Sequence, residues 1–154
     1  IGDSLNKFFD ENYINEAIDE SYEDRIYITK SFYNIDLKNY EALQISYKAN
    51  DSKKIIVSIA GVISYPEGIN ACKKQMYNIS DELSEIFPLA IKKDWGKYKS
   101  TNNEGHYFPI TFDLEDGSTA MVSCHDWNEN IEIIDNLKIT LFETKYSEYL
   151  KQKN

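Results

Sequence analysis

A stripe of apolar residues between two prolines constrains the fold of this chain more than any other feature. Apolar side chains recur there at steps of three and four, which places them on one face of an α-helix. Pro66 suits the first turn of such a helix, and Pro88 should end it. We therefore predict one amphipathic helix, whose stripe must be covered by a second apolar surface. The stripe consists of Ile69, Cys72, Met76, Ile79, Leu83 and Ile86.

The segment from Phe108 to Cys124 supplies such a surface as a β-hairpin. Apolar residues alternate with other residues on both sides of Glu115-Asp116-Gly117, which is the period of a half-buried strand. A three-residue loop with Gly117 in the left-handed conformation closes Leu114 against Ser118. A two-residue Asp116-Gly117 turn matches fewer apolar pairs, so we predict the longer loop. Its pairs are Phe112 with Ala120, Ile110 with Val122 and Phe108 with Cys124.

An earlier hairpin is predicted around Asn50-Asp51-Ser52. With these three residues as the loop, every apolar side chain meets an apolar partner on one face, and a one-residue slip would lose that match. The apolar run then continues through Ile63, which favours a strand inside the sheet over one at its edge. The predicted pairs are Tyr47 with Ile55, Ile45 with Val57 and Leu43 with Ile59.

Short helices are predicted at both ends of the chain. Residues 4–20 indicate one or two helices capped by Ser4, and residues 144–150 indicate a terminal helix capped by Thr144. Residues 137–141 alternate as a last strand, whereas the apolar patches at 26–28 and 32–35 fit either strand or irregular structure. We therefore expect a single α+β domain over residues 1–154. Its sheet should be mainly antiparallel, built from two hairpins and a C-terminal strand, with the helices on one face.

The two cysteines occupy positions from which they can meet. Cys72 lies on the stripe of the predicted helix, and Cys124 lies on the apolar face of the second hairpin. We predict a disulfide between them, with two buried free thiols as the alternative. The disulfide would close the long loop between Cys72 and Cys124 and thereby stabilise the fold by roughly 4 kcal/mol. A disulfide implies an oxidising compartment, and the chain starts at Ile1 without an initiator Met, so we expect a periplasmic or secreted protein; free thiols would fit the cytoplasm.

The charge of the chain argues against two classes of partner. The formal net charge is −9, whereas nucleic acid and anionic membranes both select basic surfaces. No apolar run is long enough for a membrane span, so no membrane insertion is expected. A basic protein partner fits the charge. Four lysines around Trp95 and Tyr98 resemble the pattern of single-strand binders, but we interpret them as a solvated edge strand. They are Lys92, Lys93, Lys97 and Lys99.

Candidate contact residues gather at the end of the second hairpin that lies away from Gly117. The predicted register brings His106 near Asp126, and His125 is next to both Cys124 and Asp126. Neighbouring residues of a strand point to opposite faces, so Cys124 and His125 should not act together as a catalytic pair. Aromatic residues beside polar loops favour ligand or partner contact. The candidate contacts are His106, His125, Asp126, Trp127, Trp95 and Tyr98.

No spacing in the chain matches a catalytic, metal-binding or nucleotide-binding motif, so we predict no catalytic residue, no metal ligand and no cofactor. The first hypothesis is a non-catalytic exported binding domain, of which an acidic inhibitor or immunity-type protein is one version. The second is a small enzyme or ligand-binding protein that uses the His106, His125 and Asp126 end of the sheet. The third is a self-associating structural subunit, and the sequence leaves the oligomeric state open.

Overall fold

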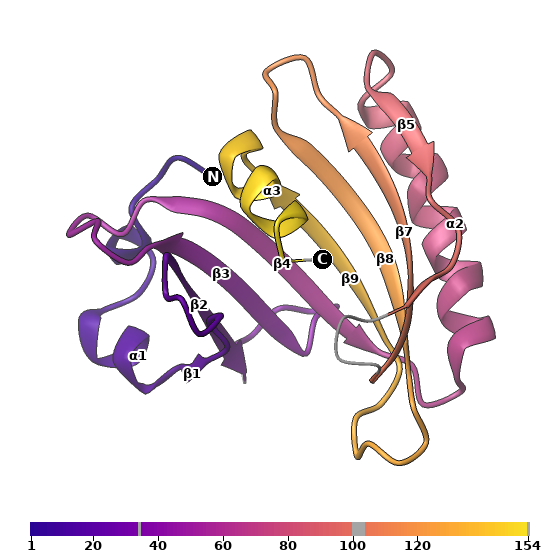
Figure 1. Cartoon of the computed structure of the whole chain (residues 1–154), viewed down its shortest axis with the longest axis horizontal. Coiled ribbons are helices and arrows are strands. Elements are labelled where there is room, and N and C mark those ends of the chain that lie inside the picture. Colours follow the sequence, from indigo (N-terminus) through magenta and orange to yellow (C-terminus); the bar gives the residue numbers. More distant parts are fainter. Residues whose placement is uncertain (34, 100–103, 154) are drawn as a thin grey trace.

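One antiparallel sheet organises the protein, which confirms the predicted α+β class. The computed structural model describes residues 1–33, 35–99 and 104–153. Within these residues nine strands pair in the order β1-β2-β3-β4-β9-β8-β7-β5, and β6 also pairs with β7 (Figure 1). The strands are β1 (Ile18–Asp19), β2 (Tyr27–Tyr33), β3 (Ala42–Lys48), β4 (Ile56–Ser64), β5 (Ile91–Asp94), β6 (Tyr98–Lys99), β7 (Gly105–Asp113), β8 (Thr119–Trp127) and β9 (Asn136–Phe142). The helices are η1 (Leu5–Lys7, a 3₁₀ turn), α1 (Glu11–Glu16), α2 (Ile69–Ile86) and α3 (Thr144–Lys151).

The predicted amphipathic helix is α2, and it packs on β8 and β9. Its stripe faces the core as expected up to Leu83, but Ile86 is 65% exposed, so that position was predicted wrongly. The helix ends at Ile86 because Phe87 leaves the helical conformation, and the ring of Phe87 then packs against the core instead. Pro88 follows directly, in agreement with its predicted role as a stop signal.

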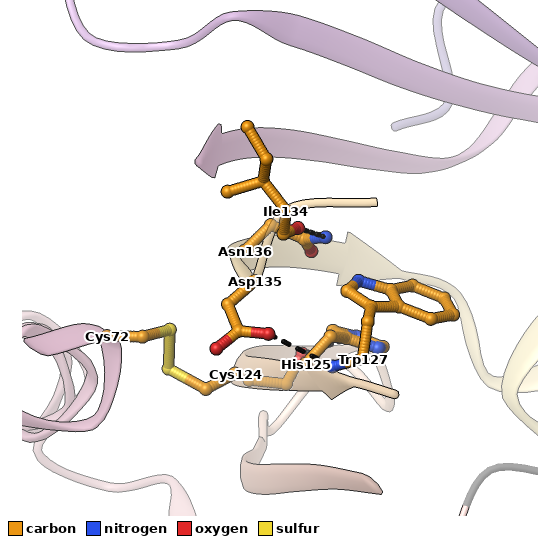
Figure 2. Close-up of a disulfide and its surroundings, with 8 residues drawn as sticks. Cys72, Cys124, His125, Trp127, Ile134, Asp135 and Asn136 are labelled. Atoms are coloured by element: carbon orange, nitrogen blue, oxygen red, sulfur yellow. Dashed lines mark hydrogen bonds between the residues drawn. A yellow bond between two sulfur atoms is a disulfide. The ribbon is translucent and has the colours of Figure 1, made fainter. Parts of the chain in front are cut away.

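The two cysteines join α2 to the sheet. Cys72 of α2 and Cys124 of β8 form a disulfide, with their Cα atoms 6.0 Å apart (Figure 2). Both residues are fully buried, within a cluster that includes Met76, Ile110 and Val122. The predicted pairing is therefore present, and it ties the helix to a central strand rather than to an edge.

The second hairpin has the predicted register throughout. Phe112 pairs with Ala120, and Phe108 pairs with Cys124. The amide of Leu114 donates to the carbonyl of Ser118, and Gly117 has a φ of 83°. Only glycine adopts that conformation without strain, so it closes the three-residue loop.

The predicted register of the first hairpin is wrong, by two residues at Ile45 and by one at Tyr47. Ile45 pairs with Ile59 rather than with Val57, and a bulge separates this pair from Tyr47 opposite Ile56. The loop is longer than three residues because the carboxylate of Asp51 accepts hydrogen bonds from the amides of Lys53 and Ile55. Because of the bulge, Ile56 and Ile59 face the α2 side, whereas Val57 packs in the α3 cluster, so the predicted face that joins Ile55, Val57 and Ile59 does not form.

The helices do not share one face of the sheet, contrary to our expectation. Met121 packs with the α3 cluster, whereas its strand neighbours Ala120 and Val122 pack towards α2. Helix α3 therefore covers the face opposite to α2; in Figure 1 it lies over β4 and β9. Its buried residues, Tyr146 and Tyr149, pack there against Tyr27, Val57 and Phe142. The N-terminal segment packs on the α2 face, since Leu5 and Ile14 cluster with Ile45.

Neither predicted helix cap forms. The hydroxyl of Ser4 donates to the carbonyl of Lys53, and α1 is capped by Asp10, whose carboxylate accepts from the amide of Tyr13. Thr144 is the first residue of α3, and its hydroxyl donates to the carbonyl of Gly117. Both hydroxyls therefore bind a hairpin loop instead of the helix end that follows them in the chain.

Candidate functional site

The α3 face of the sheet carries a cavity of about 450 Å³, a volume typical of small-molecule sites. One wall is formed by residues of β7 and β8 and of the segment between β5 and β6. The opposite wall comes from α3, the end of β9 and the loop between β1 and β2. The lining residues are Tyr22, Trp95, Tyr98, Gly105, His106, Tyr107, Pro109, Thr111, Met121, His125, Trp127, Phe142, Ser147, Leu150 and Lys151.

A row of aromatic rings crosses the sheet along the first wall. Tyr98, Tyr107 and His125 are direct cross-strand partners on β6, β7 and β8. The ring centroids of Tyr98 and Tyr107 are 5.6 Å apart, and those of Tyr107 and His125 are 5.8 Å apart with an interplanar angle of 16°. Trp127 continues the row, with its ring 5.8 Å from that of His125 and inclined by 19°. The wall is therefore a continuous aromatic surface set by the strand register.

Trp95 lies at the open end of this row, beside Tyr98. Its ring meets that of Tyr98 edge to face, with centroids 6.3 Å apart, and both side chains are 40% exposed. The indole N–H donates to the hydroxyl of Thr111, and the ammonium group of Lys93 lies 3.3 Å from the ring centroid. These contacts fix the orientation of a large, partly exposed aromatic ring beside the cavity.

Trp127 lies at the other end of the row and carries an unused donor. Its indole nitrogen is buried and has no hydrogen-bond partner among the described residues. Its backbone amide donates to the carboxylate of Asp135 over 3.0 Å, which positions the end of β8 (Figure 2). A buried donor without a partner costs about 1–3 kcal/mol, and because this nitrogen is shielded from solvent, only other parts of Trp127 line the cavity.

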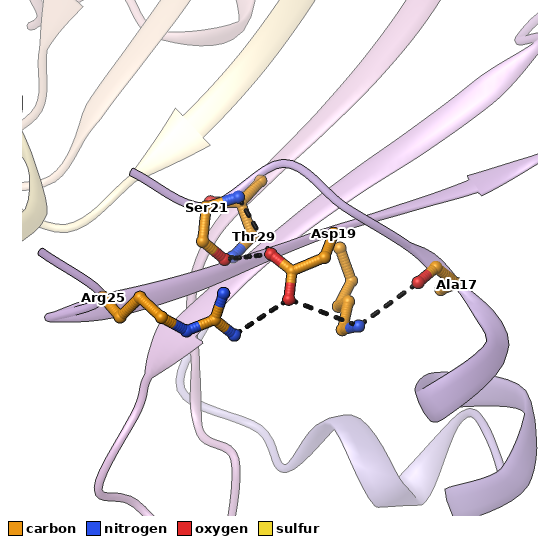
Figure 3. A network of polar contacts seen from close by, with 6 residues as sticks. Ala17, Asp19, Ser21, Arg25 and Thr29 are labelled. Carbon is orange, nitrogen blue, oxygen red and sulfur yellow. Dashed lines mark hydrogen bonds and ion pairs between the residues drawn. The ribbon is translucent and has the colours of Figure 1, made fainter. Parts of the chain in front are cut away.

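The Tyr22 side of the cavity is held by a polar network around Asp19 (Figure 3). The Asp19 carboxylate pairs with Arg25 at 2.9 Å and with Lys30 at 3.7 Å, and it accepts from the hydroxyl of Ser21 over 2.6 Å. The hydrogen bond from Ser21, followed by that from Arg25, holds the pKa of Asp19 well below its usual range. The network thereby fixes the β1–β2 loop, which carries Tyr22 between Ser21 and Arg25.

A second anchor joins this loop to α3. The carboxylate of Asp24 accepts from the hydroxyl of Tyr149 over 2.8 Å and also binds Lys153. The hydrogen bond from Lys153 is the main cause of a lowered pKa at Asp24. Tyr22 and Tyr149 meet edge to face, with ring centroids 5.8 Å apart. The loop and α3 therefore form one wall, although more than a hundred residues separate them in the chain.

His125 sits in the middle of the ring row and is a poor acid or base at neutral pH. Burial lowers the pKa of its imidazole to about 3, and the nearby charge of Lys138 adds to the effect. Its Nε2 lies 3.5 Å from the hydroxyl of Ser123. A neutral imidazole that stacks between Tyr107 and Trp127 acts as another flat ring of the wall.

The polar residues at this end of the sheet do not converge on one point. His106 and Asp126 are cross-strand partners, as predicted, but alternation places both on the α2 face, with Phe108 and Cys124. His125 points to the opposite face, and His106 reaches the cavity only at its border. Among the described residues no group of three His, Cys, Asp or Glu side chains is arranged to hold a metal ion. The arrangement offers surfaces for binding rather than a set of acid–base groups.

Of the predicted contact residues, only Asp126 does not border the cavity. Tyr107 and Met121 also line the cavity and were not among the predicted contacts, although the alternation along β7 and β8 places both on the face of His125. Tyr22, Phe142 and Leu150 were not among the predicted contacts either. No local signal marks those three, because they reach the cavity through the packing of α3 and the β1–β2 loop.

None of the helices in the described residues has the length and apolar character needed to cross a membrane. Comparison of the chain with protein-family models, with curated proteins and with solved structures finds no match.

Proposed function

We propose that the protein is a non-catalytic binding protein for a small molecule with a flat, apolar surface, held in the cavity on the α3 face. The observation that carries this proposal is the aromatic row from Tyr98 to Trp127 along one wall. Each ring offers a large apolar area at low conformational cost, and stacking on a second flat ring is favourable in addition to burial. The opposite wall adds the apolar side chains of Phe142 and Leu150.

Proteins bind small apolar ligands in sites that combine an apolar lining with a few polar groups. The cavity fits this description, since hydroxyl groups of tyrosine, Thr111 and Ser147 lie among the apolar residues. Catalysis is less well supported, because the imidazole in the centre of the wall, that of His125, has its pKa lowered to about 3. General acid–base catalysis works best with a pKa near the working pH.

We also propose that the protein acts in an oxidising compartment, the periplasm or the cell exterior. The support is the Cys72–Cys124 disulfide, which is fully buried and joins two main elements of the core. Disulfides of this kind persist where cellular reductants are absent. Fractionation of the source cells with an antibody would test this; a purely cytoplasmic signal would contradict it.

A titration with N-phenyl-1-naphthylamine, a neutral, flat fluorophore, tests the binding proposal. We expect saturable binding with an increase in dye emission and a change in tryptophan fluorescence, because both tryptophans of the chain line the cavity. Tyr107→Ala should weaken binding by about tenfold or more, because it interrupts the ring row. Tyr13→Ala is the matched control, since this ring stacks on Phe9 and Phe32 on the α2 face. Equal losses in both variants, or no saturable binding, would contradict the proposal.

A further inference from the structure

Lys138 of β9 lies on the same face of the sheet as the cavity. Its neighbours Leu137 and Ile139 pack towards α2, so alternation points the Lys138 side chain to the opposite face. It pairs with Ser123 of β8, which lies between the lining residues Met121 and His125. Lys138 does not itself line the cavity, but its charge acts on the lining residue His125, which places its ammonium group close to the ring row.

The ammonium group of Lys138 lacks a counter-ion. Within residues 1–33, 35–99 and 104–153, no hydrogen bond or ion pair is formed by this group, whereas the partly buried lysines Lys30, Lys54 and Lys153 all pair with carboxylates. Burial lowers the pKa of Lys138, and the charge of Glu20 offsets this only in part. A partly buried cation without a partner is costly, and an anion brought in by a ligand would relieve that cost.

The other polar groups of the cavity favour a ligand that accepts hydrogen bonds. Lys151 contributes an ammonium group to the lining, and the hydroxyls of Thr111 and Ser147 can donate hydrogen bonds. No carboxylate is present among the described residues that line the cavity. Because the chain as a whole carries a net charge of −9, a cavity free of acidic side chains is a local exception. The site therefore combines donors and positive charge with flat apolar walls.

We propose that the ligand is an aromatic carboxylate, whose carboxylate group binds the ammonium group of Lys138 while its flat body lies on the ring row. This inference rests on the proposed binding function and names the ligand class for the same site. The carboxylate and the ammonium group would form an ion pair with a charge-assisted hydrogen bond. Such bonds are strongest in partly buried sites.

A matched pair of ligands, naphthalene-2-acetate and naphthalene-2-acetamide, tests the inference by calorimetry. The two share the ring system, but the amide lacks the charge and has an NH2 group in place of one oxygen, so the wild-type protein should prefer the acid by about tenfold or more. Equal affinity for both would overturn the inference and leave the proposed function standing. Failure of both ligands to bind would count against the proposed function as well.

Variants then assign the preference to one residue. Lys138→Met should bring the affinity for the acid down to that for the amide, and Lys138→Arg should keep most of the preference. Lys74→Met is the control for the change in net charge, because Lys74 is exposed on α2, on the other face of the sheet. A preference that survives in Lys138→Met, or that is lost in Lys74→Met, would overturn the inference. The wild-type comparison of acid and amide needs no variant and holds whether or not Lys138→Met folds.

Discussion

Cys124 and His125 are neighbours in strand β8, but they point to opposite faces of the sheet. The sulfur of Cys124 is bonded to Cys72 of α2, whereas His125 points the other way (Figure 2). The ring of His125 stacks between those of Tyr107 and Trp127. One face of this strand is therefore fixed to the core by a covalent bond, while the other face forms the wall of the cavity. A stable core directly behind the binding wall holds the rings in place without a ligand.

The disulfide predicts both a chemical and an energetic result. Ellman titration of the denatured, unreduced protein should find no free thiol, because both cysteines of the chain are bonded. The double variant Cys72→Ala/Cys124→Ala should lose about 4 kcal/mol of unfolding free energy, since the bond closes a long loop in the unfolded chain. Urea denaturation measures the loss. Two reactive thiols in the wild-type protein would contradict the bond and the proposed compartment together.

His125 predicts a dependence of stability on pH. Its pKa is about 3 in the folded protein and near 6.5 in the unfolded chain, so between these values only the unfolded chain takes up the proton. The stability should therefore fall as the pH falls through this window, by up to about 1.4 kcal/mol per pH unit from this residue. His125→Gln should remove that part of the slope in urea denaturation at several pH values. An unchanged slope would show that His125 is not buried as a neutral ring.

Asp19 predicts a coupling between a surface network and the cavity. Asp19→Asn removes the charge that pairs with Arg25 and Lys30, and we expect a loss of about 1 kcal/mol at pH 7 because these pairs are partly exposed. The pKa of Asp19 is lowered on folding, so its stabilisation is present above its ordinary value, near 3.8, and is lost at lower pH. The difference in unfolding free energy between Asp19→Asn and wild type should accordingly shrink below that pH.

The same variant should also weaken binding of N-phenyl-1-naphthylamine, because the loop that carries Tyr22 is less well fixed. Asp116→Asn is a suitable control. Asp116 likewise accepts from a serine hydroxyl, that of Ser118, but at a hairpin loop outside the cavity lining. Equal binding by Asp19→Asn and wild type would show that the network serves stability alone.

Tyr149 predicts a hydroxyl-specific effect on α3. Tyr149→Phe keeps the ring in its cluster but removes the hydrogen bond to Asp24, so the unfolding free energy should fall by about 1 kcal/mol. Tyr13→Phe is the control, because the ring of Tyr13 stacks on Phe9 while its hydroxyl forms no hydrogen bond within the part of the chain that the structure describes. Thermal denaturation compares the two variants. A larger loss in Tyr13→Phe would contradict the assigned role of Asp24 as an anchor for α3.

The sequence allowed a correct prediction of those parts of the fold that depend on local periodicity. The apolar stripe predicts the helix α2, and the alternation around Gly117 predicts the β7–β8 hairpin with its register. Together these two elements bring Cys72 to Cys124. The register of the first hairpin was wrong because hydrogen bonds of the Asp51 side chain lengthen its loop, an effect that the apolar pattern does not report. The pattern also has no information on which face of the sheet α3 covers.

The candidate site likewise combines residues that local sequence patterns reveal with residues that only the tertiary structure brings there. Trp95, Tyr98, His125 and Trp127 could be selected from the sequence because they flank the polar end of one hairpin. Lys138 could not, since a lysine in an alternating strand usually faces water and only the position of the neighbouring strands shows its partial burial. Tyr22 reaches the cavity through contacts with α3 that no local sequence pattern encodes.

The central claim is that the cavity on the α3 face binds a flat ligand on its aromatic row. The most direct measurement is a ¹H–¹⁵N spectrum of the protein titrated with naphthalene-2-acetate. The chain has 2 tryptophans, so two indole N–H signals are expected, one from each end of the row. We predict that both signals shift with one shared dissociation constant while the amide signals of α2 stay in place. Static indole signals at millimolar ligand, or shifts confined to the α2 face, would contradict the claim.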